Sequence, residues 1–148
     1  MDNMIIKENN IEKAKKKIKI SEKPIILEAL DDHFNRKMIE YGKFNVLLDI
    51  EKGERKDQLK QMDSGLNHYL AKEMYKNKIM LGFDLNNLNN MRRKEKAIRI
   101  GKIIQNIKLS RKSGTSITLY GIKNKKDAFA LLSSLGASSK QASQAISF

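Results

Sequence analysis

The chain has 148 residues, of which 30 are Lys or Arg and 17 are Asp or Glu, so its formal net charge at pH 7 is +13. This charge makes a polyanion, and nucleic acid above all, the first class of partner to consider. The absence of cysteine excludes a disulfide framework and a cysteine-ligated metal site, and no apolar run approaches the roughly 18 residues of a membrane-spanning helix, so we expect a cytoplasmic protein without membrane contact.

Short apolar runs alternate with segments of helical periodicity, and the length of the chain favours one domain, 1–148. The basic segment 1–20 predicts either a strand at 4–6 and a helix over about 10–17, or a flexible arm. Four later runs are too short for helices and too continuously apolar for strands exposed on one face: 25–27, 46–50, 79–83 and 117–120. Segments with 3.6-residue spacing lie between and after them: 31–41, 66–77, 91–111 and 125–135. The alternation predicts βαβ units with a mainly parallel sheet of four or five strands.

Local signals support these boundaries. Asp31 stands where a helix N-cap belongs, and Gly42 and Gly136 stand where a helix ends in a left-handed residue. A last short helix is expected from Ser138 to near Ile146. In the segment 91–111, four isoleucines share one helical face and are expected to pack on the sheet: Ile100, Ile103, Ile104 and Ile107.

Residues 63–72 form the most specific motif of the chain. They read Asp-Ser-Gly-Leu-Asn-His-Tyr-Leu-Ala-Lys and predict a turn, then a helix that carries a buried-facing histidine, before the strand at 79–83. This string resembles the signature of ribonuclease P protein component 3, the α/β-barrel subunit of archaeal and eukaryotic ribonuclease P. The residues that the resemblance singles out are Asp63, Ser64, Gly65, His68 and Lys72.

The resemblance runs from roughly Ile5 to Ser147 and implies an incomplete, half TIM-like barrel. A closed barrel takes about eight βα units and about 250 residues. The resemblance implies that the N-terminal strand-helix region usual in the family is missing here. The resemblance further implies a non-catalytic subunit of ribonuclease P, whose RNA removes the 5′ leader of precursor tRNA with Mg²⁺ that the RNA itself holds. No cofactor is then expected on this chain. The implied partners are ribonuclease P RNA, precursor tRNA through the complex, and ribonuclease P protein component 2.

The strongest physical signal for RNA lies between residues 92 and 112, where nine Lys or Arg accompany one Glu. A solvated helix face is the simpler alternative, but this density favours contact with phosphates. The residues we expect to make that contact are Arg92, Arg93, Lys96, Arg99 and Lys102. A second basic group, at 13–19, either flanks the same RNA or only solubilises the chain. Because no aromatic cluster interleaves with either group, phosphate and shape contacts are expected rather than base reading.

Several roles stay open at this point. Asp63 either caps the following helix or contacts RNA or metal, and the positive end of that helix could hold a phosphate instead. His68 is more readily a structural residue than a catalyst, and His33 is expected on the surface.

An alternative function is a degenerate metal-dependent phosphoesterase-like hydrolase, although two histidines without a His-x-His pair do not supply its usual ligands. A third is a subunit that binds only other proteins.

Overall fold

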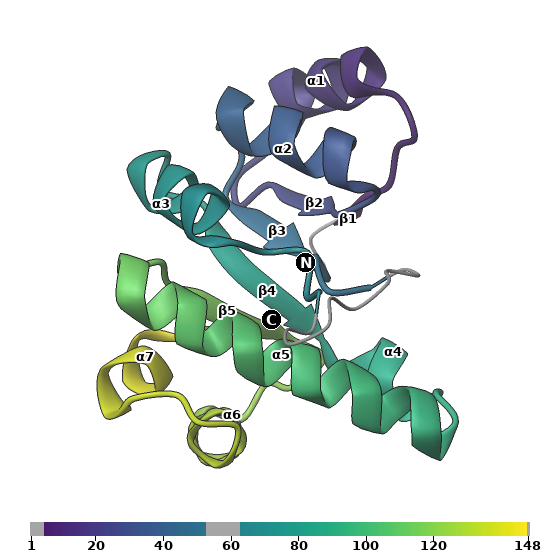
Figure 1. The fold of residues 1–148 in the computed structure, drawn as a ribbon. Helices are drawn as coiled ribbons and strands as arrows, with labels where there is room; N and C mark the ends of the chain where they lie inside the picture. Colours follow the sequence, from purple (N-terminus) through teal and green to yellow (C-terminus); the bar gives the residue numbers. More distant parts are fainter. Residues whose placement is uncertain (1–4, 53–62, 148) are drawn as a thin grey trace.

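Six parallel strands lie in the sheet in the same order as in the sequence. The computed structural model describes residues 5–52 and 63–147. The strands are β1 Ile5–Ile6, β2 Ile26–Glu28, β3 Val46–Leu48, β4 Met80–Asp84, β5 Ile117–Tyr120 and β6 Ile146–Ser147 (Figure 1). Each strand pairs with the next one along the chain, and no pairing between β1 and β6 closes the sheet within the described residues.

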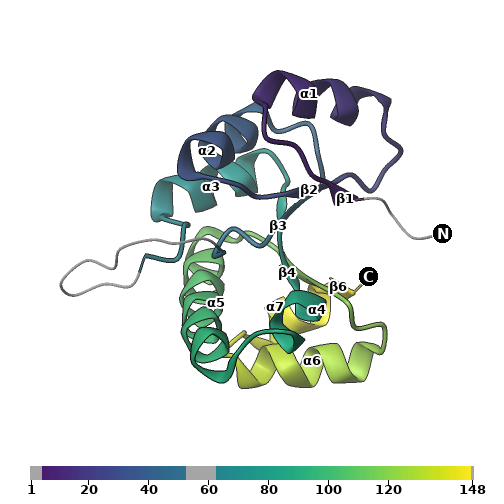
Figure 2. The ribbon, with the colours of Figure 1, turned by 90° about the vertical axis from the view of Figure 1, so that its right-hand side faces the viewer.

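Helices connect the strands and cover one side of the sheet. They are α1 Ile11–Ile20, α2 Asp32–Tyr41, α3 His68–Lys76, α4 Leu85–Asn89, α5 Arg93–Ser113, α6 Lys125–Ser134 and α7 Ser139–Gln144. Figure 2 shows the strands in an arc, with α1, α2, α3 and α5 along its outer side. This arrangement is that of an open half-barrel. Although α5 is the longest helix, no helix of the described ranges is both long and apolar enough to cross a membrane.

Side chains alternate between the two faces of the sheet. Leu47, Leu81 and Leu119 are fully or almost fully buried in the main core with residues from the helices. Their neighbours Val46 and Leu48 form a second, separate cluster with Ile26 on the other face. Gly82 makes this cluster possible, because a Cβ there would lie 2.7 Å from Val46 Cγ1 and 3.1 Å from Leu48 Cδ1.

The expected α/β half-barrel is confirmed, and the expected neighbours β3 and β4 pair in parallel. The sheet has six strands rather than four or five, because β1 and β6 contribute only two residues each. The last helix was expected to end near Ile146, but it stops at Gln144 and Ala145 turns to an extended conformation. On α5, Ile103 and Ile107 are buried in the core, whereas Ile100 and Ile104 are half-buried.

The N-terminal segment belongs to the folded part from residue 5 onward. β1 pairs with β2, and α1 buries Ala14 and Ile18 against the core. The lysines of the basic group 13–19 are exposed or half-buried on this helix, which Asn10 caps by accepting from Lys13 N at 3.1 Å. A strand and a helix, rather than a loose arm, therefore describe residues 5–20.

Candidate functional site

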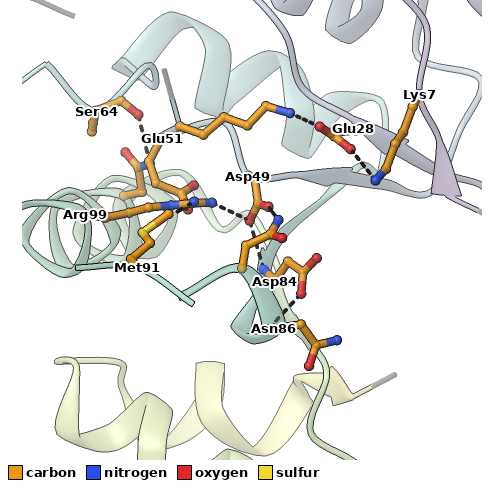
Figure 3. A network of polar contacts seen from close by, with 12 residues as sticks. Lys7, Glu28, Asp49, Glu51, Ser64, Asp84, Asn86, Met91 and Arg99 are labelled. Atoms are coloured by element: carbon orange, nitrogen blue, oxygen red, sulfur yellow. Dashed lines mark hydrogen bonds and ion pairs between the residues drawn. The ribbon is translucent and has the colours of Figure 1, made fainter. Parts of the chain in front are cut away.

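Polar side chains gather where the first strands of the sheet end. Because all strands are parallel, their carboxyl ends lie along one edge, and that edge is where α/β folds usually place their function. Glu28 ends β2, and its carboxylate pairs with Lys7 Nζ at 3.5 Å and with Lys52 (Figure 3). Lys7 follows β1 and Lys52 follows β3, so one carboxylate joins the ends of three strands.

A buried carboxylate pair occupies the centre of this edge. The guanidinium of Arg99 on α5 lies between Asp49 and Glu51, both just after β3: Nη2 is 3.1 Å from Asp49 Oδ1, and Nε is 3.2 Å from Glu51 Oε1. The side chains of all three are 9 % exposed or less. Asp49 also accepts hydrogen bonds from Asp84 N at 2.8 Å and Asn87 Nδ2 at 3.1 Å. Asp49 therefore ties β3 to β4, α4 and α5.

The single positive charge of Arg99 cannot neutralise two ionised carboxylates. Burial, followed by the charge of Asp49, raises the pKa of Glu51 to about 7, although Arg99 acts in the opposite direction. Burial also raises the pKa of Asp49, although the hydrogen bond from Asp84 N and the charge of Arg99 both lower it. Within the described residues, Glu51 Oε2 has no hydrogen-bond partner. Two buried carboxyl groups thus face a single guanidinium, and Glu51 keeps its proton up to about pH 7.

The motif segment 63–67 lies beside this network and is held by the same helix. Asp63 Oδ1 accepts from Gly65 N at 3.0 Å, and Gly65 has the positive φ of 81° that this turn requires. Ser64 is 1 % exposed. From α5, Gln105 Nε2 donates to Ser64 Oγ and Asn106 Nδ2 donates to Ser64 O, both at 3.1 Å. α5 therefore fixes the chain on both sides of residues 53–62, through Arg99 before them and through Gln105 and Asn106 after them.

The motif helix differs from the sequence prediction at its beginning. α3 starts at His68, and its N-cap is Asn67, whose side chain accepts from Leu70 N at 2.9 Å. Asp63 is therefore a turn residue rather than the cap of this helix. The prediction of a buried-facing His68 is wrong, because the side chain is exposed in the first turn of α3.

The other positions on which expectations were placed lie on the surface. Lys72 is exposed on α3. His33 is exposed on α2, as expected. His68 and Lys72 are exposed on α3, whereas Ser64 is buried against α5, so the motif residues do not form one joint cluster.

The five basic residues expected to contact phosphates divide into three classes. Arg92 and Arg93 are exposed, Lys96 is half-buried, and Arg99 and Lys102 are only 8 % and 6 % exposed. The phosphate role of Arg99 must be corrected, since its guanidinium is already engaged by two carboxylates. Lys102 points to the same inner side of α5. Exposed basic side chains at other positions of this helix form its outward face: Lys94, Lys108, Arg111 and Lys112.

Sequence reasoning missed the residues that build the network. Asp49 and Glu51 follow a buried strand directly, which is a usable signal for the functional edge of a parallel sheet. On α5, Asn106 and Ser110 occur at the spacing of its buried face, which indicates buried polar partners. Within the described ranges, no group of three or more acidic or histidine side chains is arranged to hold a metal ion.

Fold and site together define an open α/β half-barrel with a polar network at the carboxyl ends of its strands and a basic helix alongside. In sequence, the chain is 28 % identical over 123 residues to "Ribonuclease P protein component 3" of Methanococcus maripaludis strain C7, a match that covers 78 % of this chain and 50 % of that protein. The protein of the same name from strain C6 gives the same figures. The resemblance to component 3 that the motif predicts is thereby confirmed. No family model matches the chain.

Among solved structures, the fold is similar to a chain in "cryo-EM structure of archaeal Ribonuclease P with mature tRNA". The TM-score is 0.74 at 23 % identity, and the match covers 92 % of this chain and 59 % of that one. The chain thus spans about half the length of the curated relatives it matches. The half-barrel is confirmed as a known fold by this likeness.

Proposed function

We propose that this chain is a protein subunit of ribonuclease P that binds and stabilises the catalytic RNA. The observation that carries the proposal is the similarity to component 3 over 123 residues, which the fold match supports independently of the motif. The net charge of +13 agrees with a polyanionic partner. In this role the RNA removes the 5′ leader of precursor tRNA with Mg²⁺ that it holds itself, and the chain binds no cofactor. Protein component 2 is the proposed protein partner, and the cytoplasm the proposed compartment.

The outward face of α5 is the surface that suits RNA best. Its exposed basic residues are Arg93, Lys94, Lys108, Arg111 and Lys112, and the N-cap Arg92 is exposed beside them. An α-helix rises about 1.5 Å per residue, so these side chains extend along roughly 30 Å and can meet several phosphates. Each phosphate contact releases condensed counterions, which makes binding strong at low salt and weak at high salt. Arg99 supports this face from beneath, because its ion pairs hold α5 to the sheet.

The competing hydrolase function is disfavoured by the geometry of the carboxylates. Asp49 and Glu51 are neighbouring buried carboxyl groups, as a metal site would need, but the guanidinium of Arg99 pairs with both of them. Metal analysis of the purified protein and an assay with a phosphodiester substrate test this alternative. Stoichiometric metal together with metal-dependent hydrolysis would favour it over the RNA-binding subunit.

The salt dependence of RNA binding tests the proposal. Affinity for ribonuclease P RNA is measured at several salt concentrations for Arg93→Gln/Lys94→Gln and for Arg111→Gln/Lys112→Gln, with circular dichroism as a check on helix content. Each lost contact is expected to flatten the slope of log K against log salt by roughly 0.7–0.9, with little dependence on sequence.

The matched control removes the same amount of charge from another surface. Lys13 and Lys16 are exposed on α1, so Lys13→Gln/Lys16→Gln also lowers the net charge by two. If only the α1 pair changes the slope, the RNA surface lies on α1 rather than on α5. If the unaltered protein shows no salt-dependent affinity for this RNA, the RNA-binding function itself is refuted and a subunit that binds only proteins is favoured.

A further inference from the structure

A basic hollow lies at the edge of the sheet opposite to the buried carboxylates. It has a volume of about 520 Å³ and is formed where the ends of α1, α2 and α3 meet the loops that lead into β2, β3 and β4. Four lysines line this lysine hollow: Lys19, Lys23, Lys43 and Lys78. All four are exposed.

The parallel topology explains why these lysines meet. Each helix runs back along the sheet, so its C-terminal end lies near the amino ends of the strands. The partial negative charge of a helix C-terminus favours a cation beside it. Lys19 lies in the last turn of α1, and Lys43 and Lys78 directly follow the ends of α2 and α3. Lys23, in the loop before β2, adds a fourth cation.

The lining carries these positive charges without a negative one. No Asp or Glu is among the described residues that form the hollow, and none of the four lysines makes an ion pair with a described carboxylate. The acids next to α1 pair elsewhere, since Glu8 lies 2.9 Å from Lys17 Nζ and Glu12 lies 3.9 Å from Lys15 Nζ. Like charges around one hollow repel one another, and a polyanion that enters the hollow removes this repulsion.

The floor of the hollow is fixed by the fold. Ile25 and Phe44 are 6 % and 4 % exposed. Asn45 Oδ1 accepts from Ile25 N at 2.7 Å, and Asn77 Nδ2 donates to Ile39 O at 2.8 Å. Because its oxygen is engaged in this way, the Asn45 side chain offers the hydrogens of its Nδ2 amide to a ligand. Amide and ammonium donors of this kind are the groups that bind phosphate oxygens of nucleic acids.

The hollow lies next to the C-terminal end of the basic helix α5. Lys78 N donates to Tyr75 O at 3.1 Å, and the ring of Tyr75 lies against Gly114, where an added Cβ would be 3.2 Å from Tyr75 Cε2. Gly114 is the C-cap of α5 and follows the exposed Arg111 and Lys112. α3 and α5 thus bring two basic surfaces to the same edge of the sheet.

We propose that the lysine hollow binds consecutive phosphates of an RNA backbone, so that RNA held by the end of α5 extends across the amino-end edge of the sheet. The inference rests on the proposed RNA-binding function and adds to it the edge at which the RNA lies. This edge is the one away from Glu28, Asp49 and Glu51. Because the contacts are made to phosphates, binding at the hollow does not depend on base sequence.

The salt dependence of RNA binding tests the hollow. Lys23→Gln/Lys43→Gln removes two of its four charges. The matched control is Lys125→Gln/Lys126→Gln, which removes two exposed lysines from the start of α6, on the side of the carboxyl ends of the strands. Affinity of the full chain for ribonuclease P RNA is measured at several salt concentrations, with circular dichroism as a check on folding. The hollow pair should flatten the slope of log K against log salt by roughly 1.4–1.8, twice the value for one contact, and the control pair should leave it unchanged.

Lysine acetylation gives a second readout that needs no variant. The full chain is treated with an acetylating reagent, with and without ribonuclease P RNA, and the acetylation rate of each lysine is followed by mass spectrometry. We expect the RNA to slow acetylation in the lysine hollow and to leave Lys125 and Lys126 unaffected. Tripolyphosphate at the same concentration of phosphate groups should protect the hollow far less, because it is too short to reach the end of α5 as well.

The possible negative results have different meanings. If the hollow pair and the control pair give equal slopes, and RNA does not slow acetylation in the hollow, the lysine hollow is overturned. The RNA-binding function then stands as long as the α5 variants still flatten the slope. Equal protection by tripolyphosphate and RNA would assign the hollow to free phosphate anions and overturn RNA as its occupant. Absence of salt-dependent affinity in the unaltered protein would overturn both proposals.

Discussion

Replacing Glu51 by Gln should change how the stability of the protein depends on pH. The pKa of Glu51 rises from an ordinary value of 4.5 to about 7 because the group is buried and lies beside Asp49. In the unfolded chain this carboxyl group loses its proton near pH 4.5, whereas in the folded chain it keeps the proton until about pH 7. The unfolded state is therefore favoured progressively as the pH rises through this window.

The size of the effect follows from the same pKa. A rise from 4.5 to about 7 corresponds to about 3 kcal/mol, which is lost between about pH 4.5 and 7 and stays lost at higher pH. Gln keeps an oxygen that can accept from Arg99 Nε but cannot ionise. Glu51→Gln should therefore gain up to about 3 kcal/mol relative to the unaltered protein between pH 5 and pH 8.

The free energy of unfolding is measured by urea denaturation at several pH values between 5 and 8.5, with circular dichroism as the signal. Glu40→Gln, which alters an exposed ion pair with Arg36, controls for the general loss of an acidic group. Stability curves of Glu51→Gln and the unaltered protein that run parallel over this range would refute the reasoning, as would a relative stability of Glu51→Gln that falls with pH.

Three further substitutions test the packing and the network by urea unfolding. Gly82→Ala should cost about 1–3 kcal/mol, because the new Cβ would lie 2.7 Å from Val46 Cγ1; an unchanged midpoint would show that the inner face has room for it. Ile103→Ala should cost about 2–5 kcal/mol, whereas Ile98→Ala, at a 47 % exposed position of the same helix, should cost far less. Arg99→Met leaves the two buried carboxylates without their counter-charge and should cost about 3–5 kcal/mol at pH 8, so a loss below about 1 kcal/mol would contradict the role given to Arg99.

The central strands could be predicted because a strand that is buried on both faces appears in the sequence as a short run of mostly apolar residues. The run 79–83 is apolar throughout and the run 46–50 is apolar except for Asp49, and they became the paired strands β4 and β3. The outer strands could not be predicted in the same way. β6 has two residues, and its place in the sheet depends on pairing with β5 rather than on its own composition.

The candidate site was harder to predict because its key contacts join distant parts of the chain. Arg99 lies in a dense basic segment, where an arginine is expected to face solvent, and its partner Glu51 is 48 residues away. Nothing local distinguishes it from Arg93, which is exposed. The start of α3 was placed too early for a different reason: several residues between Asp63 and Asn67 can cap a helix, and only the backbone geometry selects Asn67.

The order of the strands has a consequence for synthesis of the chain on the ribosome. Every strand adds to the edge left by the strand before it, so the sheet can grow in the direction in which the polypeptide emerges. Asp49 and Glu51 leave the ribosome well before Arg99, which reaches them only with α5. Until that helix docks, neither acid has its guanidinium partner. The docking of α5 is thus the step at which the nascent protein pairs these acids and ties the end of β3 to the later part of the chain.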